Sequence, residues 1–151
     1  MDKLGDNFPK ELIEKSIFIK GGVFLKKKHQ FRSELPKPRI FFVLNTQPQN
    51  DDRIITVHAT TKIESRKKVR ISEVLVEIKP DEYEELKDFS IVDCESFIVW
   101  RKIELQKCIK SGDIIPLKTV SENLLNKLRV AIANSKTLAT IDKRLIIPED
   151  E

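Results

Sequence analysis

The sequence predicts a mainly β domain with several helices, built as a small curved sheet or barrel with the helices packed outside. Five or six short segments are apolar and rich in β-branched or aromatic residues, which favours strands. Fewer segments carry the capping residues and apolar stripe of a helix. At 151 residues, the chain fits one domain with a core of its own.

Strands are predicted mainly in the first two thirds of the chain. Strand-like residues run from Ile17 to Leu25, interrupted by Gly21-Gly22, which permits a turn or bulge. The clearest strand is Arg39 to Asn45, and Arg53 to Val57 is expected to be its hairpin partner across a turn-rich connection. Further strands are expected at 74–78, 90–94 and 97–100.

The best predicted helix follows Ser121, a good N-cap, and carries an apolar stripe through Leu124, Leu128 and Ile132. Shorter helices are expected at 9–15, at 79–86 and at 102–110, the last ending before Gly112. The segment 138–147 is compatible with helix or strand. The two basic segments 26–38 and 61–73 are expected to be exposed loops, because the first contains Pro36 and Pro38 and shows no sustained periodicity.

One domain is expected at residues 20–147, with an N-terminal extension bearing a short helix at 1–19 and an acidic tail at 148–151. No apolar run approaches the roughly 20 residues of a membrane helix, and the first residues lack the apolar core of a secretion signal. Cys94 and Cys108 are too few for a disulfide framework or a metal site. We therefore expect a cytoplasmic protein with no membrane association, no metal and no cofactor.

Positive charge is concentrated in one part of the sequence. Residues 26–70 contain 12 Lys or Arg against 4 Asp or Glu, although the whole chain has a net charge of only +4. Such asymmetry is typical of proteins that bind a polyanion, nucleic acid above all. Two solvated loops would look the same, and charge alone does not distinguish the two interpretations.

An ordered set of segments resembles a known family. "PRIFFVLN", "IITVHATT", "VEIKPDEY", "SIVDCES" and "LLNKLRVAI" follow one another as in the MazF/PemK-like toxins of toxin–antitoxin systems. The resemblance extends over about residues 20–145. It implies an SH3-like barrel that forms a homodimer and cleaves single-stranded RNA without a metal ion, through attack by the 2′-hydroxyl. It also implies a cognate antitoxin that neutralises the activity.

The resemblance places the functional Arg and Thr of the family on Arg39 and Thr60. Arg39 would stabilise the phosphate during cleavage. A guanidinium suits this role because its planar fork matches phosphate oxygens and supplies positive charge where negative charge develops in the transition state. Thr60 would donate a hydrogen bond to the same phosphate. Thr61 is the neighbouring candidate, and strand alternation allows only one of these two hydroxyls to reach the site.

His29 and His58 are the only histidines, and either could transfer a proton near neutral pH. We favour His29, which lies in the basic segment before Arg39. Nearby lysines at 26–28 should lower its pKa and so favour a neutral base. A packed or exposed histidine without a catalytic task is the alternative for each.

Basic and hydroxyl side chains of the two basic segments are the candidates for holding the RNA backbone. They are Lys26, Lys28, Arg32, Lys37, Thr61, Arg66 and Lys67. The same cations could receive the acidic part of an antitoxin, because a polyanion mimic competes for the same surface. Charged runs also occur simply for solubility.

The sequence departs from the family at three positions. Gly22 stands where the family usually has Asp, and Ser96 and Ile98 stand where many members have Gln and Arg. The alternative interpretation is therefore a non-catalytic barrel of the same fold that binds RNA or a protein partner.

Overall fold

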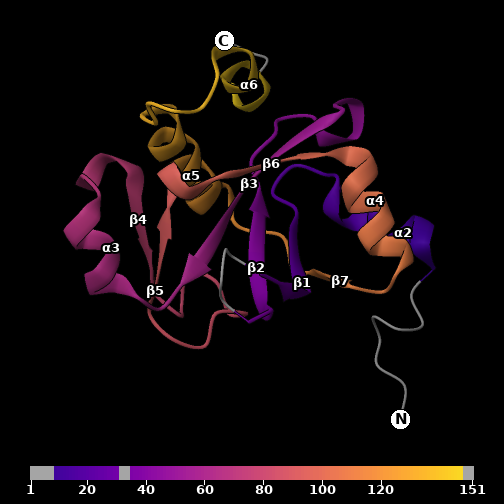
Figure 1. Cartoon of the computed structure of the whole chain (residues 1–151), viewed down its shortest axis with the longest axis horizontal. Coiled ribbons are helices and arrows are strands. Elements are labelled where there is room, and N and C mark those ends of the chain that lie inside the picture. Colours follow the sequence, from indigo (N-terminus) through magenta and orange to yellow (C-terminus); the bar gives the residue numbers. More distant parts are fainter. Residues whose placement is uncertain (1–8, 31–34, 148–151) are drawn as a thin grey trace.

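The computed structural model describes residues 9–30 and 35–147, which form an antiparallel sheet of seven strands with helices around it (Figure 1). The strands are β1 (Val23–His29), β2 (Lys37–Val43), β3 (Arg53–Thr60), β4 (Leu75–Ile78), β5 (Ser90–Asp93), β6 (Ile98–Arg101) and β7 (Ile114–Leu117). The α-helices are α2 (Lys10–Ile17), α3 (Ile63–Val69), α4 (Lys102–Lys110), α5 (Glu122–Ala133) and α6 (Thr140–Lys143). Short 3₁₀ turns are η1 (Pro48–Asn50), η2 (Ser72–Val74), η3 (Cys94–Ser96) and η4 (Arg144–Ile146).

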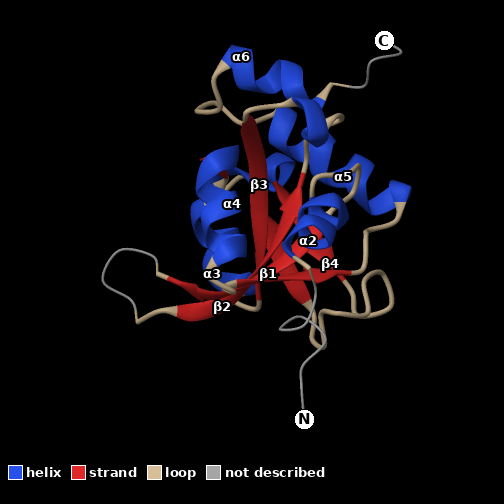
Figure 2. Cartoon of the chain, turned by 90° about the vertical axis from the view of Figure 1, so that its right-hand side faces the viewer, coloured by secondary structure: helices blue, strands red, loops and turns tan. Residues whose placement is uncertain are grey.

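Each face of the sheet has its own apolar core, because successive side chains of a strand point to opposite faces. Phe42 and Val57 belong to one core, together with Leu128 of α5. Phe41 belongs to the other, together with Ile17 of α2. Figure 2 shows β3 standing between α4 on one side and α5 on the other. The apolar stripe predicted for α5 is therefore the face that covers the sheet.

Strand β3 is the centre of the sheet and is paired along both edges. One edge pairs with β2. The other edge is shared, since Ile54 lies opposite Trp100 of β6 and Ala59 lies opposite Val92 of β5. The 3₁₀ turn η3 separates these two partners. The segment from Ser90 to Arg101 therefore runs along β3 as one strand with a break in the middle.

The strand order runs β4-β5-β3-β2-β1-β7, with β6 paired to β3 beside this path. Among the described residues, no pairing joins β4 to β7, so the sheet is not closed into a barrel. The predicted antiparallel sheet with helices outside is confirmed at this level. Within the same residues, no helix is long and apolar enough to cross a membrane.

The strand expected from Ile17 is wrong in its first half. Ile17 is the last residue of α2, and the strand begins only at Val23. Between them the chain turns so sharply that a Cβ on Gly22 would lie 2.1 Å from the carbonyl oxygen of Ile17. Glycine at position 22 therefore permits the helix and the strand to meet.

The two basic segments are more regular than predicted. In the first, β1 continues to His29 and β2 begins at Lys37, with an irregular register that leaves Pro38 outside the paired positions. In the second, residues 63–69 form α3. The helix expected at 79–86 is absent, β7 was not predicted, and 138–147 is helical through α6 and η4.

Candidate functional site

The predicted Arg39 and Thr60 lie on the same face of the sheet, on adjacent strands. The β2–β3 register pairs Phe41 with His58. Arg39 precedes Phe41 by two residues and Thr60 follows His58 by two, so strand alternation puts all four side chains on one face. The β2–β3 pairing ends at Phe41 and His58, and beyond it Arg39 pairs with Lys26 of β1 while Thr60 pairs with Ile91 of β5. The structure thus places these two predicted residues on the face that also carries Phe41 and His58.

The ring of Phe41 is the centre of an aromatic cluster on this face. Its centroid lies 5.1 Å from that of His29, 5.7 Å from that of His58 and 5.7 Å from that of Trp100. The Trp100 indole is fixed by Nε1, which donates a 2.8 Å hydrogen bond to Oγ1 of Thr56. Because β2 lies between β1 and β3, the two histidines are held on either side of one buried phenyl ring.

Both histidines are neutral at pH 7. Burial lowers the pKa of His29 to about 4, helped by the positive charges of Lys26 and Arg39 and opposed by Asp113. Burial likewise lowers the pKa of His58 to about 4, with Arg39 the next largest cause. The lowered pKa of His29 was expected, but its main cause is burial rather than the lysines. Two neutral imidazoles beside a guanidinium can accept protons and are poor proton donors.

Thr60 also has a local structural task. Its Oγ1 accepts a 3.2 Å hydrogen bond from the backbone N–H of Lys62, directly before α3. The hydroxyl hydrogen is not used in that bond and can still be donated. Thr61 is exposed, and by strand alternation it does not share the face of Thr60.

Asp93, at the end of β5, was not among the predicted site residues. It binds two arginine side chains from the α3 segment beside the site. Its side chain is only 3% exposed. It accepts hydrogen bonds from Arg66 Nη1 at 3.2 Å and from Arg70 Nε at 2.9 and 3.2 Å. Ser96 Oγ and the backbone N–H of Glu95 complete the set, at 3.1 and 3.0 Å.

A signal for Asp93 exists in the sequence. It is the one acid in the apolar run "SIVDC", and an acid in a buried strand needs a partner. The two arginine partners, however, come from α3 and from the residue directly after it, where the sequence predicted only a loop. Asp93 raises and Arg66 lowers the pKa of His58, so this ion-pair cluster contributes to the electrostatics of the site.

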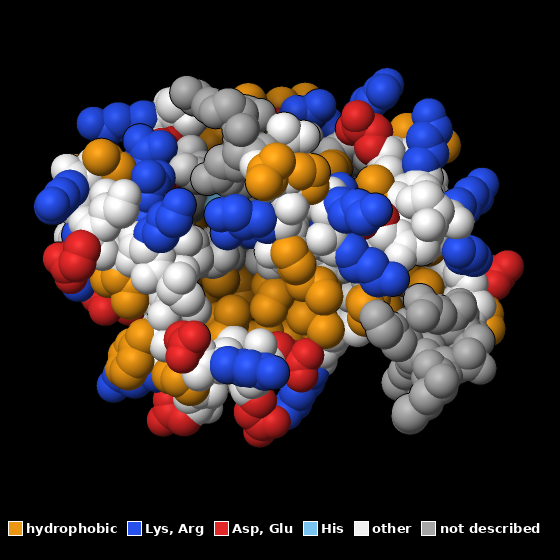
Figure 3. Space-filling view, turned by 60° about the horizontal axis from the view of Figure 1, so that its bottom comes forward, with side chains coloured by type: hydrophobic (Ala, Val, Ile, Leu, Met, Phe, Trp, Pro, Cys, Tyr) orange, Lys and Arg blue, Asp and Glu red, His pale blue; other side chains and the backbone are white. Residues whose placement is uncertain are grey.

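The other predicted RNA-binding cations differ in how available they are. Lys26 is largely buried and forms a 2.7 Å ion pair with Asp113. Lys67 pairs with Glu77 at 3.2 Å. Lys28 and Lys37 are exposed at the end of the β1–β2 hairpin. Arg32 lies outside the described residues. Figure 3 shows Lys and Arg side chains spread across the underside of the molecule, above a central area of exposed apolar side chains.

No group of three His, Cys, Asp or Glu side chains that could hold a metal ion occurs within residues 9–30 and 35–147. Cys94 is buried, and burial raises the pKa of its thiol well above the usual range.

Comparison with known proteins identifies a solved structure of similar fold. No protein-family model matches the sequence, and no curated protein matches it. Solved structures do match, among them an endoribonuclease in complex with its cognate antitoxin from a mycobacterial species. The TM-score is 0.51 at 14% sequence identity, and the alignment covers 80% of this chain and 96% of that chain. The chain therefore shares the fold of a toxin endoribonuclease, the class of protein that its sequence resembles.

Proposed function

We propose that this protein is a metal-independent endoribonuclease toxin that cleaves single-stranded RNA and is neutralised by an antitoxin. The observation that carries the proposal is that Arg39 and Thr60 lie on the face of the sheet where His29 and His58 flank Phe41. The fold shared with an endoribonuclease supports the same reaction class.

In the proposed reaction, the ribose 2′-oxygen attacks the adjacent phosphorus and the bond from phosphorus to the 5′-oxygen breaks. His29 accepts the proton of the 2′-hydroxyl and, with a pKa of about 4, releases it to water. Arg39 stabilises the negative charge of the pentavalent intermediate, and Thr60 donates a hydrogen bond to the same phosphate. The departing 5′-oxygen takes a proton from water. The products carry a 2′,3′-cyclic phosphate and a 5′-hydroxyl.

His29 is assigned the proton transfer because it is the last residue of β1, at the loop end of the β1–β2 hairpin. Exposed Lys28 and Lys37 stand at the same end and would hold the backbone on either side of the scissile phosphate. An acidic antitoxin segment would compete for these cations. The proposal includes a homodimer, as the resemblance implies.

A second candidate function is RNA binding without cleavage. Two positions that many family members use for Gln and Arg are occupied differently here. Ser96 is engaged with Asp93 and Arg70, and Ile98 packs against the apolar core of the site face. A protein of this kind would bind RNA with a strong salt dependence and leave it intact.

The deciding experiment incubates the purified protein with a long single-stranded RNA in EDTA. We expect discrete fragments that end in 2′,3′-cyclic phosphate. Arg39→Ala should lower the cleavage rate by about 100-fold or more, as loss of a charge-stabilising donor does in other enzymes. Arg144→Ala is the matched control, because Arg144 is an exposed arginine on η4 with no place in the site.

Wild-type cleavage that persists in Arg39→Ala would contradict the assigned role of Arg39. Intact RNA with the wild-type protein, together with a salt-sensitive gel shift, would replace the first function by the second.

A further inference from the structure

The two arginines of the α3 segment are bound to Asp93 unequally. Arg70 uses Nε on both carboxylate oxygens and reaches Oγ of Ser96 through Nη2 at 3.4 Å. Arg66 makes one contact, from Nη1 to Oδ2 at 3.2 Å. Both guanidinium groups are about one third exposed, whereas the carboxylate is almost fully buried. The arginines can therefore turn outward, and Asp93 cannot.

The cost of releasing each arginine differs accordingly. If Arg66 leaves, Asp93 keeps Arg70, the Ser96 hydroxyl and the Glu95 amide, so no buried charge is left unpaired. If Arg70 leaves, the buried carboxylate loses its closest cation and Ser96 loses a donor. Removing one partner from a buried charge is the expensive case. Arg66 is thus the exchangeable member, and Arg70 is the anchor of α3.

We propose that Asp93 occupies, in the free protein, the place of an RNA phosphate on Arg66, and that Arg66 binds a second backbone phosphate when RNA arrives. The carboxylate and a phosphodiester are both monoanions whose oxygens accept from a guanidinium. Asp93, the partner of Arg66, lies beside the site, because Val92 before it pairs with Ala59, the residue that follows His58. The choice of RNA as the ligand rests on the proposed function.

The contact between Arg66 and Asp93 in the free protein should weaken the binding of RNA. The free site keeps its guanidinium ordered and partly neutralised, so the charge is released only to a ligand that can replace the carboxylate. Neutralising Asp93 should therefore tighten the binding of RNA. A merely structural Asp93 would give the opposite result, since its loss would loosen α3.

The test measures the Kd of a short, fluorescently labelled 2′-O-methyl RNA at several salt concentrations. This RNA lacks the attacking hydroxyl, so it reports binding whether or not the protein cleaves. For Arg66→Ala we expect the slope of log K against log salt to fall by about 0.7 and the Kd at about 0.1 M salt to rise about five-fold, as for one lost phosphate contact on a single strand.

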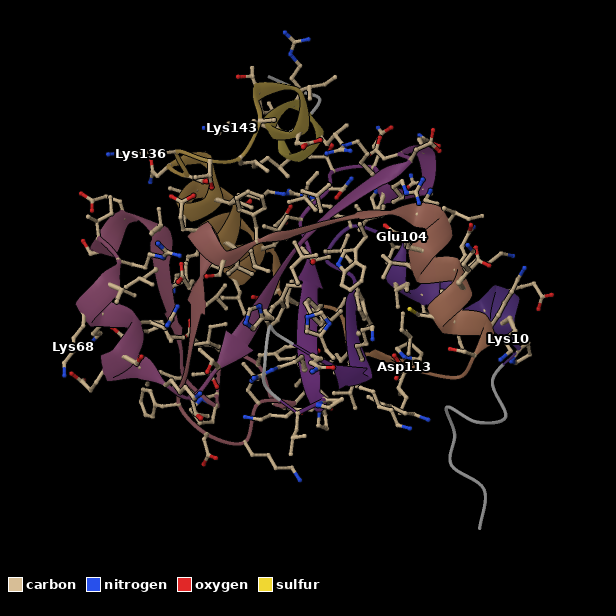
Figure 4. All side chains as sticks on the ribbon, in the orientation of Figure 1. Lys10, Lys68, Glu104, Asp113, Lys136 and Lys143 are labelled. Carbon is tan, nitrogen blue, oxygen red and sulfur yellow. The ribbon has the colours of Figure 1, made fainter. Side chains whose placement is uncertain are left out.

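The matched control is Lys68→Ala, on the same helix. Figure 4 shows Lys68 pointing away from the sheet, so its removal should leave the slope unchanged. Asp93→Asn should lower the Kd, and Asp93→Asn combined with Arg66→Ala should bind no better than Arg66→Ala alone, because the gain acts through Arg66.

Four results would overturn the inference: an unchanged slope in Arg66→Ala, an equal loss in Lys68→Ala, weaker binding by a folded Asp93→Asn, or no binding of RNA by the wild-type protein. If Asp93→Asn fails to fold, the comparison of the salt slopes of Arg66→Ala and Lys68→Ala still tests the inference. Cleavage of unmodified RNA, measured beside this series, separates the two proposals. Cleavage with an unchanged slope removes only the Arg66 subsite, and a changed slope without cleavage removes only the nuclease.

Discussion

Asp93 and Glu95 are two residues apart at the break between β5 and β6, and each holds a different part of the molecule. Asp93 faces the site and is bound by the arginines of the α3 segment. Glu95 faces the loop between α5 and α6 and is bound by neutral donors. These are the hydroxyls of Ser135 and Thr137 and the backbone amides of Lys136 and Thr137.

The difference lies in what can replace each set of partners. Backbone amides and short hydroxyl side chains are fixed by the loop that they belong to, so Glu95 serves as a permanent anchor. Burial alone would raise the pKa of Glu95, but these hydrogen bonds outweigh it and lower the pKa to about 2. Arginine side chains are long and cationic, so another anion can recruit them. One short turn thus carries an anchor on one side and an exchangeable contact on the other.

The largest loss of stability is expected in the apolar core between α5 and the sheet. Leu128→Ala removes a fully buried side chain from this core and should lower the free energy of unfolding by about 2–5 kcal/mol. Val130→Ala, on the same helix but 67% exposed, should change it by less than about 0.5 kcal/mol. Denaturant unfolding measures both. RNA affinity of folded Leu128→Ala should equal that of the wild type, and a loss of affinity would show that the two sides are not separable.

Glu95→Gln should have a smaller effect, about 1–3 kcal/mol, because a carboxylate with several donors is replaced by an amide. The contribution of Glu95 is complete above the ordinary carboxyl pKa and is lost as the pH falls toward about 2, because the unfolded state takes up the proton first. Unfolding curves measured from pH 7 to pH 3 check this. Tighter RNA binding by Glu95→Gln, as expected for Asp93→Asn, would remove the distinction between the two acids.

The third effect appears only below pH 6.5 and concerns the two histidines of the site side. Their pKa values of about 4 lie below the ordinary 6.5, so the unfolded chain binds protons before the folded protein does. Stability should therefore fall as the pH drops from 6.5 to about 4 and change little above 6.5 on their account. NMR titration of the imidazole carbon-bound protons follows each ring, and His29→Asn assigns them. Titration of both rings near pH 6.5 would contradict the buried, positively charged setting described for the site.

Much of the sheet could be predicted because its strands carry their own signal. Residues 40–43 and 54–57 are apolar or β-branched and lie in the predicted hairpin. Helix α5 was marked by Ser121, whose hydroxyl accepts from the amide of Leu124. Helix α3 carried no such signal, because it has no buried residue and no side-chain cap. Its contacts with Asp93 come from a strand more than 20 residues away, which local patterns do not reveal.

Part of the candidate site could also be predicted from the sequence. Arg39 and Thr60 follow from an ordered resemblance plus strand alternation. The pairing of Lys26 with Asp113 and of Arg66 with Asp93 depends on which distant elements meet, so the sequence could name the cations but not their counter-ions. His58 was weighed against His29 in the sequence and is placed beside Arg39 only by the β2–β3 register.

The chain contains a single tryptophan, Trp100, and it belongs to the aromatic cluster around Phe41. Trp100 is in edge contact with the rings of both His29 and Phe41. Its fluorescence therefore arises entirely from the neighbourhood of the candidate site, without a background signal from a second indole. The protein carries its own optical probe, through which ligand arrival and imidazole protonation can be followed in solution without any label.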